Sequence, residues 1–162
     1  MRSLIMLVGF ATAASAQQPA ARTFTSAAEV TAMIAKAGSE RKPDQANFIQ
    51  PLLQAAPYSV NLEYRVKAVD GTAAIHETEA EVFYVLDGTA TLTIGGKLRA
   101  EKRSNAMNLS GTGIDGGTSR RIAKGDFFLV PENTPHQFTD AADALVLMSL
   151  HVPRGVTESH SK

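Results

Sequence analysis

The chain has 162 residues, of which 44% are hydrophobic and 20% are charged, a composition typical of one globular domain with a sizeable core. Lysine plus arginine and aspartate plus glutamate both number 16, so the net charge is zero and no nucleic acid or anionic membrane is indicated as a partner. Because the chain has no cysteine, disulfides and thiolate metal sites are excluded.

The first 16 residues have the pattern of a secretory signal peptide. Arg2 supplies a positive charge, residues 4–13 are apolar, and Ala14-Ser15-Ala16 fits a cleavage site of small residues. The apolar stretch is too short to cross a bilayer as a helix. We therefore expect a secreted or periplasmic protein with no membrane attachment after cleavage of residues 1–16; the alternative is a buried or disordered N-terminal segment.

Residues 17–57 are expected to form a polar leader, a short helix and an irregular segment. Ser26 and Glu29 have the spacing of a capping box. Apolar residues then recur on one helical face, which predicts a helix over 27–37 that ends at Gly38. Beyond it, prolines at 43, 51 and 57 predict an irregular chain, whose apolar residues either cover the domain or meet a second subunit.

From residue 58 the period changes to two, which predicts β-strands. Polar and apolar residues alternate over 58–68 and over 89–94, and a further strand region runs from about 73 to 86, interrupted by acidic residues. Asp87-Gly88 is typical of a hairpin turn. Apolar runs at 127–130 and 144–152 predict two more strands, the second of them central. Short strands separated by glycine and proline turns predict an all-β sandwich or barrel over 58–153, followed by a polar tail, 154–162.

Residues 97–121 are rich in basic side chains and in glycine, serine, threonine and asparagine. A connection of this length is usually a functional loop or disordered. We expect either a solvated surface or a rim that attracts an anionic ligand over a pocket. The basic residues concerned are Lys97, Arg99, Lys102, Arg103, Arg120 and Arg121.

The most unusual stretch is 76–88, where His76 and three glutamates, Glu77, Glu79 and Glu81, precede an apolar run. Such charge at the start of a strand is either solvated or carries ligands into a pocket. Imidazole and carboxylate together suit Zn, Fe, Mn, Ni or Cu. On an extended chain Glu81 faces opposite to His76, so a turn or bulge near 78–80 is needed to aim both at one pocket.

Two segments resemble the signature motifs of the cupins. Glu81 is separated from Gly88 by six residues, His76 has the spacing of the first motif's second histidine, and Gly71 lies close to its opening glycine. The second motif is matched by residues in register, with Asn133 at a glycine position and Asp140 at the final asparagine position; the matching residues are Gly125, Pro131 and His136.

The resemblance covers about residues 59–152 and implies a cupin jelly-roll β-barrel, or double-stranded β-helix. It also implies a metal held by two histidines and a glutamate of the first motif and a histidine of the second. Ala74 stands where the first of these histidines is expected. The ligands that remain are His76, Glu81 and His136, with Glu79 as the alternative carboxylate, and three protein ligands leave positions open for water or substrate.

The function implied is binding of a divalent metal ion, a small organic ligand or both inside the barrel. A metal-dependent enzyme would be of oxygenase, isomerase or lyase type, with no catalytic residue identified; the alternative is a non-catalytic small-molecule-binding module without metal. Homodimers are common among proteins that the chain resembles. Residues that belong first to the core and are expected to contact substrate are Tyr64, Phe83, Phe138 and His151, the last being either inside the barrel or hydrogen-bonded near the end of its strand.

Overall fold

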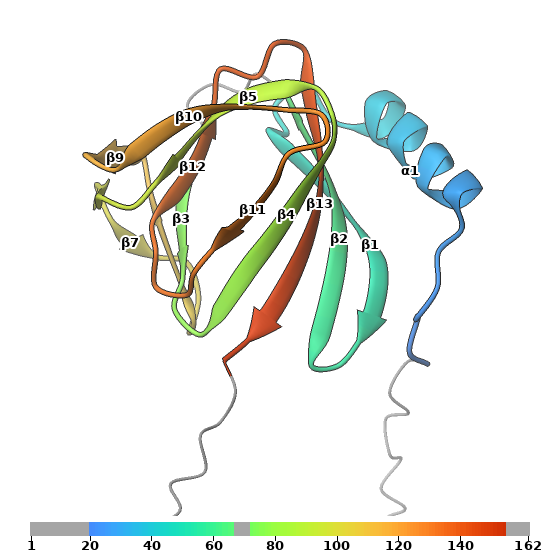
Figure 1. Ribbon diagram of the computed structural model, residues 1–162, viewed down its shortest axis with the longest axis horizontal. Coiled ribbons are helices and arrows are strands. Elements are labelled where there is room, and N and C mark those ends of the chain that lie inside the picture. The colour runs from blue at the N-terminus through green and yellow to red at the C-terminus, as the bar shows by residue number, and fades with distance from the viewer. Residues whose placement is uncertain (1–19, 67–71, 155–162) are drawn as a thin grey trace, which may run out of the picture.

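The computed structural model describes residues 20–66 and 72–154, which form two facing antiparallel sheets with one helix outside them (Figure 1). The predicted signal peptide, Gly71 of the first motif and the end of the polar tail lie outside the described residues. In the part described, no helix has the length and apolar character needed to span a membrane. The predicted all-β jelly-roll with one short N-terminal helix is confirmed.

The first sheet has five strands and the second has six, all paired antiparallel. The first sheet runs in the order β1 (Asn47–Ala55), β2 (Tyr58–Val66), β13 (Ala144–Pro153), β4 (Glu79–Asp87), β11 (Phe127–Val130). The second runs in the order β10 (Thr118–Ala123), β5 (Thr89–Ile94), β12 (His136–Thr139), β3 (Ala73–His76), β8 (Asn108–Gly111), β7 (Lys102–Arg103). A separate pair joins β6 (Lys97–Arg99) to β9 (Gly113–Asp115). The predicted central position of the last strand is confirmed, because β13 lies between β2 and β4.

The space between the sheets holds the main core. Alternation along β4 turns Phe83 and Val85 inward, where they meet Leu92 of β5 and Leu147 of β13. All four side chains are fully buried. Glu81 lies on the same inward face two residues before Phe83, so the strand that builds the core also carries a carboxylate into the interior.

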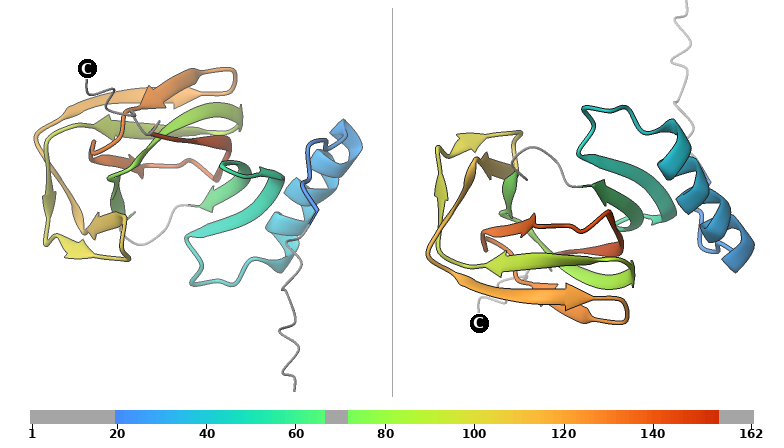
Figure 2. Two further views of the ribbon diagram at one scale, coloured as in Figure 1. Left: turned by 90° about the horizontal axis from the view of Figure 1, so that it is seen from below. Right: turned by 90° about the horizontal axis from the view of Figure 1, so that it is seen from above.

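Helix α1 (Ala27–Glu40) packs on the outer face of the first sheet, beside β1 and β2 (Figure 2). Its predicted capping box is confirmed, since the Ser26 amide donates to Glu29 Oε2 at 2.7 Å and the Glu29 amide donates to Ser26 Oγ at 3.3 Å. Met33 and Ile34 cover Leu62 of β2, so burial drives the helix onto the sheet. The helix continues through Gly38 to Glu40, three residues beyond the predicted end.

Two segments that were predicted to be irregular contain strands. Residues 43–57 include β1, an edge strand that tolerates Pro51 because its register shifts between Pro51 and Leu53. Residues 97–121 include β6 to β10 rather than one long loop. The longest of the strands β6 to β10 has six residues and the others have two to four, which is too short for a periodic pattern to reveal them.

The predicted hairpin at Asp87-Gly88 is wrong. Strand β4 pairs with β11 and β13 in the first sheet, whereas β5 pairs with β10 and β12 in the second. The chain therefore crosses from one sheet to the other at Gly88, which has φ +85°. A Cβ at this position would clash with the carbonyl oxygen of Ala144, so glycine is required both by the backbone angle and by the close approach of β13.

Gly88→Ala is expected to lower the free energy of unfolding by at least about 2 kcal/mol, because left-handed backbone strain adds to a backbone clash. Urea denaturation measures this loss. Gly125→Ala is the matched control, since Gly125 has φ +93° but no atom within 4 Å of an added Cβ. The control should lose only about 1–2 kcal/mol from strain, and equal losses in the two variants would contradict the clash.

Candidate metal centre

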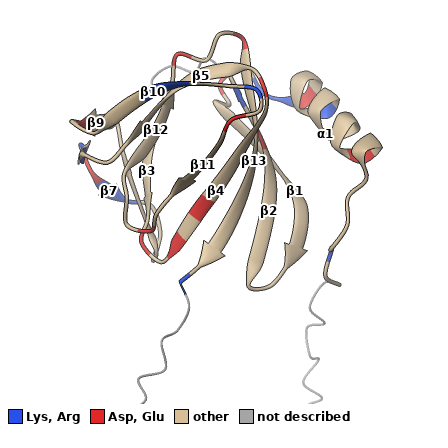
Figure 3. Ribbon diagram, viewed as in Figure 1, with Lys and Arg blue, Asp and Glu red and all other residues tan. Residues whose placement is uncertain are grey.

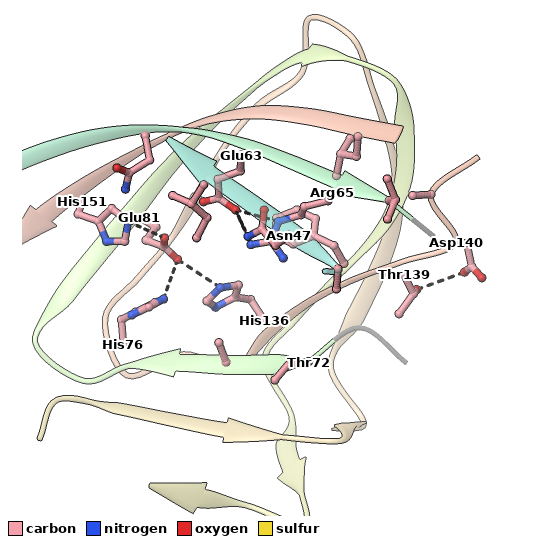
Figure 4. A pocket seen from close by; sticks show the side chains of 18 residues that line it. Asn47, Glu63, Arg65, Thr72, His76, Glu81, His136, Thr139, Asp140 and His151 are labelled. Carbon is pink, nitrogen blue, oxygen red and sulfur yellow. Dashed lines mark hydrogen bonds and ion pairs between the residues drawn. The ribbon is translucent and has the colours of Figure 1, made fainter. Parts of the chain in front are cut away.

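A cavity of about 580 Å³ lies between the two sheets. Figure 4 shows three histidines around Glu81 at one part of this cavity, with Asn47, Glu63 and Arg65 beside them. A cavity of this size is in the range that holds a small organic molecule. The polar groups gathered here are the residues from which a functional site can be built.

Local chain geometry brings His76 and Glu81 to the same place. Strand β3 ends at His76, the chain bends at residues 77–78, and β4 begins at Glu79. The predicted turn near this point is therefore confirmed, and it changes the phase of the alternation so that Glu81 faces inward. His136 begins β12 directly opposite Ala74 of β3, which carries it to the same end of the cavity.

The structure brings together the three residues that the sequence predicts as ligands. Oε2 of Glu81 lies 3.1 Å from Nε2 of His76 and 3.2 Å from Nε2 of His136. The Glu81 side chain is only 4% exposed. One ligand atom from each residue lies within 4.8 Å of the other two, which is close enough for one ion to contact all three.

Hydrogen bonds at Nδ1 of His76 and of His136 orient the two imidazoles so that Nε2 faces Glu81. Nδ1 of His76 lies 3.0 Å from Oδ1 of Asn108, and Nδ1 of His136 lies 3.4 Å from the carbonyl oxygen of Thr134. Because both partners are acceptors, Nδ1 carries the proton and the lone pair of Nε2 faces Glu81. Oε2 of Glu81 is buried and has no well-aligned hydrogen bond, although both nitrogens are near it. Two lone pairs facing a buried, unsatisfied carboxylate oxygen fit a metal cation.

The protonation of the site follows from its neighbours. Burial raises the pKa of the Glu81 carboxyl, but the His136 and His76 imidazoles lower it by more, so this pKa lies below its ordinary value. Burial lowers the pKa of His76, but the Glu81 carboxylate and Asn108 raise it by more, so this pKa lies above its ordinary value. Glu81 is therefore an anion at neutral pH, and a metal must compete with a proton at His76.

The other candidate carboxylate, Glu79, has a different place. Its Oε1 lies 2.8 Å from Nδ1 of His151 and 3.6 Å from Nδ1 of His76, on the side of these rings that faces away from Glu81. Nε2 of His151 in turn lies 3.2 Å from Oε1 of Glu81. Glu81 is thus the carboxylate that meets both His76 and His136, and His151 adds a third imidazole beside it.

A polar wall adjoins the histidines, and the sequence did not predict it. Glu63 is buried, and its Oε2 accepts from Nε of Arg65 at 2.8 Å and from Nδ2 of Asn47 at 3.0 Å. The Arg65 guanidinium lies 4.6 Å over the ring of Phe138. The alternation of β2 indicates a polar face, but that face lines the cavity, while the apolar face packs against α1.

Comparison with known proteins gives the fold a name. No protein-family model and no curated protein matches the sequence. Among solved structures, KdgF from a Halomonas species has a TM-score of 0.52 at 16% identity, with 72% of this chain and 86% of that chain covered. The Schizosaccharomyces pombe Cnp3 cupin domain has a TM-score of 0.50 at 14% identity, with 67% and 66% covered. The chain has the cupin fold. The Bacillus halodurans protein BH2720 aligns over 83% of both chains, with a TM-score of 0.51 at 16% identity.

One ligand position of the first cupin motif carries no histidine in this chain. Ala74, at the position of the first motif's missing histidine, lines the cavity but has no donor atom. The imidazole of His151, on strand β13, nevertheless lies beside Glu81. By strand parity His151 shares a face with Leu145 and Leu147, but the sequence left open whether its side chain lies inside the barrel; this parity was the signal that could have brought it into the site.

Of the four residues predicted to contact substrate, two line the cavity and two do not. Phe138 and His151 line the cavity. Phe83 is fully buried beneath it, with ring centroids 5.1 Å from Phe128 and 5.4 Å from Phe138, so it supports the wall. Tyr64 lies on the opposite face of the sheet in the cluster with α1, and the expectation that it contacts substrate is corrected, because the phase of β2 turns it outward.

Of the two alternatives for the basic residues of 97–121, the structure favours the solvated surface over a rim around the cavity. The blue segments of the ribbon in Figure 3 mark basic residues in β7 and β10. Among the cavity-lining residues that the structure describes, none belongs to the six basic residues named above. Arg103 instead pairs with Glu77, donating through Nη1 to Oε2 at 2.7 Å and through Nη2 to Oε1 at 3.1 Å. Among the described residues, the cation that lines the cavity is Arg65, a polar residue of the alternating strand predicted over 58–68.

Proposed function

We propose that this protein binds a divalent metal ion through His76, Glu81 and His136, and a small organic molecule in the adjoining cavity. The observation that carries the proposal is the buried Oε2 of Glu81, which lacks an aligned hydrogen bond and has two imidazole nitrogens at 3.1 and 3.2 Å. Neutral imidazoles and a carboxylate suit Zn, Fe, Mn, Ni or Cu.

The ion, when bound, supplies Lewis acidity toward an oxygen of the organic molecule or a site for O₂ chemistry. The protein residues position and shield the ligand. Nε and Nη2 of Arg65 both face the Glu63 carboxylate, and one face of the guanidinium lies over the Phe138 ring. Within the described residues, Nη1 donates to no protein acceptor. A guanidinium fixed in this way is suited to an anionic or oxygen-rich group of the ligand.

On this basis we propose a metal-dependent enzyme of oxygenase, isomerase or lyase type. A second candidate is a non-catalytic binding module. It is favoured by the fact that both buried carboxylates, Glu63 and Glu81, already have partners within the protein. Glu63 already accepts from Asn47 and Arg65, and Glu81 faces imidazoles. A general base must be free to accept a proton from its substrate, and neither buried carboxylate is free in this way.

Metal analysis tests the proposal. The protein is loaded separately with Zn, Mn, Fe(II), Ni and Cu, desalted, and its metal content measured by mass spectrometry. The wild type should retain about one ion per chain for at least one metal, and His76→Ala and His136→Ala should each lose it, because each removes one of three ligands. Asp87→Asn is the control, since Asp87 is an exposed carboxylate on the same strand as Glu81. Stoichiometric metal that survives both histidine substitutions would refute the site.

A further inference from the structure

His151 approaches the proposed metal centre from a direction that neither cupin motif supplies. It lies on β13 directly opposite Glu81 of β4, and its side chain lines the cavity. Its Nε2 is 3.2 Å from Oε1 of Glu81, and its ring centroid is 5.6 Å from that of His76. His76, His136 and His151 therefore surround one carboxylate, with Nε2 as the nearest atom in each case.

Glu79 determines which nitrogen of His151 faces the centre. Nδ1 of His151 lies 2.8 Å from Oε1 of Glu79. The Glu79 carboxylate can only accept a hydrogen bond here, so Nδ1 carries the proton and Nε2 presents a lone pair toward Glu81. Histidines that bind metals commonly donate their other ring N–H to a carboxylate in this way. The arrangement at His76 is the same, with Asn108 in place of Glu79.

We infer that His151 is a further ligand of the metal centre and that Glu79 is the residue that positions it, an inference that rests on the proposed function. The centre then has three imidazoles and one carboxylate. The imidazole from β13, on the first sheet, stands in for the one lost at Ala74 on the second sheet. Glu79, considered above as an alternative ligand, has instead the role of holding an imidazole.

A competing arrangement has the same contacts. His151 could be a doubly protonated imidazolium that donates to Glu79 and Glu81 at once, because an acceptor lies near each nitrogen. In that case His151 would contribute charge but no donor atom to the ion. Counting the nitrogen atoms bound to the metal separates the two arrangements.

The experiment counts imidazole nitrogens on bound Cu(II) by electron paramagnetic resonance. The chain has four histidines, so all samples carry His160→Ala, and only the three site histidines remain. Three coordinated imidazoles in this background must then include His151. His151→Ala should reduce the count to two and weaken Cu(II) binding by about 10–100-fold or more. His151→Gln, which retains side-chain volume and hydrogen bonding, gives the same count if the alanine variant is unstable.

Glu79 is tested by affinity in the same background. Glu79→Ala should weaken Cu(II) binding by about 10–100-fold while the count stays at three, and Glu79→Gln should lose less because its amide oxygen still accepts from Nδ1. Asp87→Asn is again the control. Two coordinated imidazoles in the parent, unchanged by His151→Gln, would overturn this inference and leave the proposed function intact. No Cu(II) bound at these histidines in the parent would overturn this inference, and it would overturn the proposed function as well if the wild type retained none of the other four metals.

Discussion

Glu81→Gln is expected to weaken metal binding by at least about 100-fold, because the amide oxygen is neutral and the buried cation then loses the carboxylate charge that it contacts. Glu81 is the residue that both His76 and His136 face, and its pKa, held below the ordinary value, keeps it ionised at neutral pH. Competition with a chromophoric chelator measures the dissociation constant for Zn in the wild type and the variant. Glutamine preserves the shape of the side chain, so the fold should be retained.

Glu79→Gln is the matched comparison for this prediction. It makes the same chemical change two residues away, where the carboxylate contacts the Nδ1 side of the histidines rather than Nε2. We expect its loss of affinity to be clearly smaller than that of Glu81→Gln. If Glu79→Gln were the more damaging change, the assignment of Glu81 as the ligand carboxylate would be wrong.

Arg65→Leu is expected to lower the free energy of unfolding by about 3–5 kcal/mol, because it leaves the buried Glu63 carboxylate without its cation. Glu63 is 3% exposed. Burial raises its pKa, but its neighbours lower that pKa by more, and Arg65 has the largest effect among them. Urea denaturation at neutral pH measures the loss. The effect should be large because the pair lies inside the cavity rather than on the surface.

Arg154→Leu supplies the control for this stability measurement. Arg154 also pairs with a glutamate, Glu132, at 2.8 Å, but its side chain is 63% exposed, so the loss should be about 0–1 kcal/mol. Adding Glu63→Gln to Arg65→Leu should recover part of the stability, since no unpaired charge is then buried. Equal losses for Arg154→Leu and Arg65→Leu would show that the cavity pair is solvated.

The main strands were predictable because each carries a strong local signal. The alternation in β2, the apolar run of β13 and the capping box of α1 depend only on neighbouring residues. The strands between 97 and 121 were missed because they are short and are specified by pairing across the sheet. Gly88 was assigned to a hairpin because sequence shows that the chain turns but not which sheet it enters next.

The site was predictable where its residues lie in the two segments that resemble the cupin motifs. His76, Glu81 and His136 followed from motif spacing, and the required bend before Glu81 followed from strand parity. The contribution of His151 depends on β13 lying beside β4, which is a property of the sheet order. The position of Arg65 and Glu63 in the cavity was not predicted, because alternation does not reveal which side of a sheet is covered.

Secretion and homodimer formation stay predictions from the sequence. Detection of the mature chain outside the cytoplasm, beginning after residue 16, would test the first. Equilibrium sedimentation of the purified mature chain would test the second, with a monomer mass contradicting it.

Anomalous X-ray diffraction from metal-loaded crystals tests the central claim most directly. Data collected on either side of the absorption edge of the bound metal locate that element alone. We expect one peak in contact with Nε2 of His76, Nε2 of His136 and a carboxylate oxygen of Glu81. A peak held by other residues, or no peak in crystals of protein that was loaded with each of the five metals, would contradict the account.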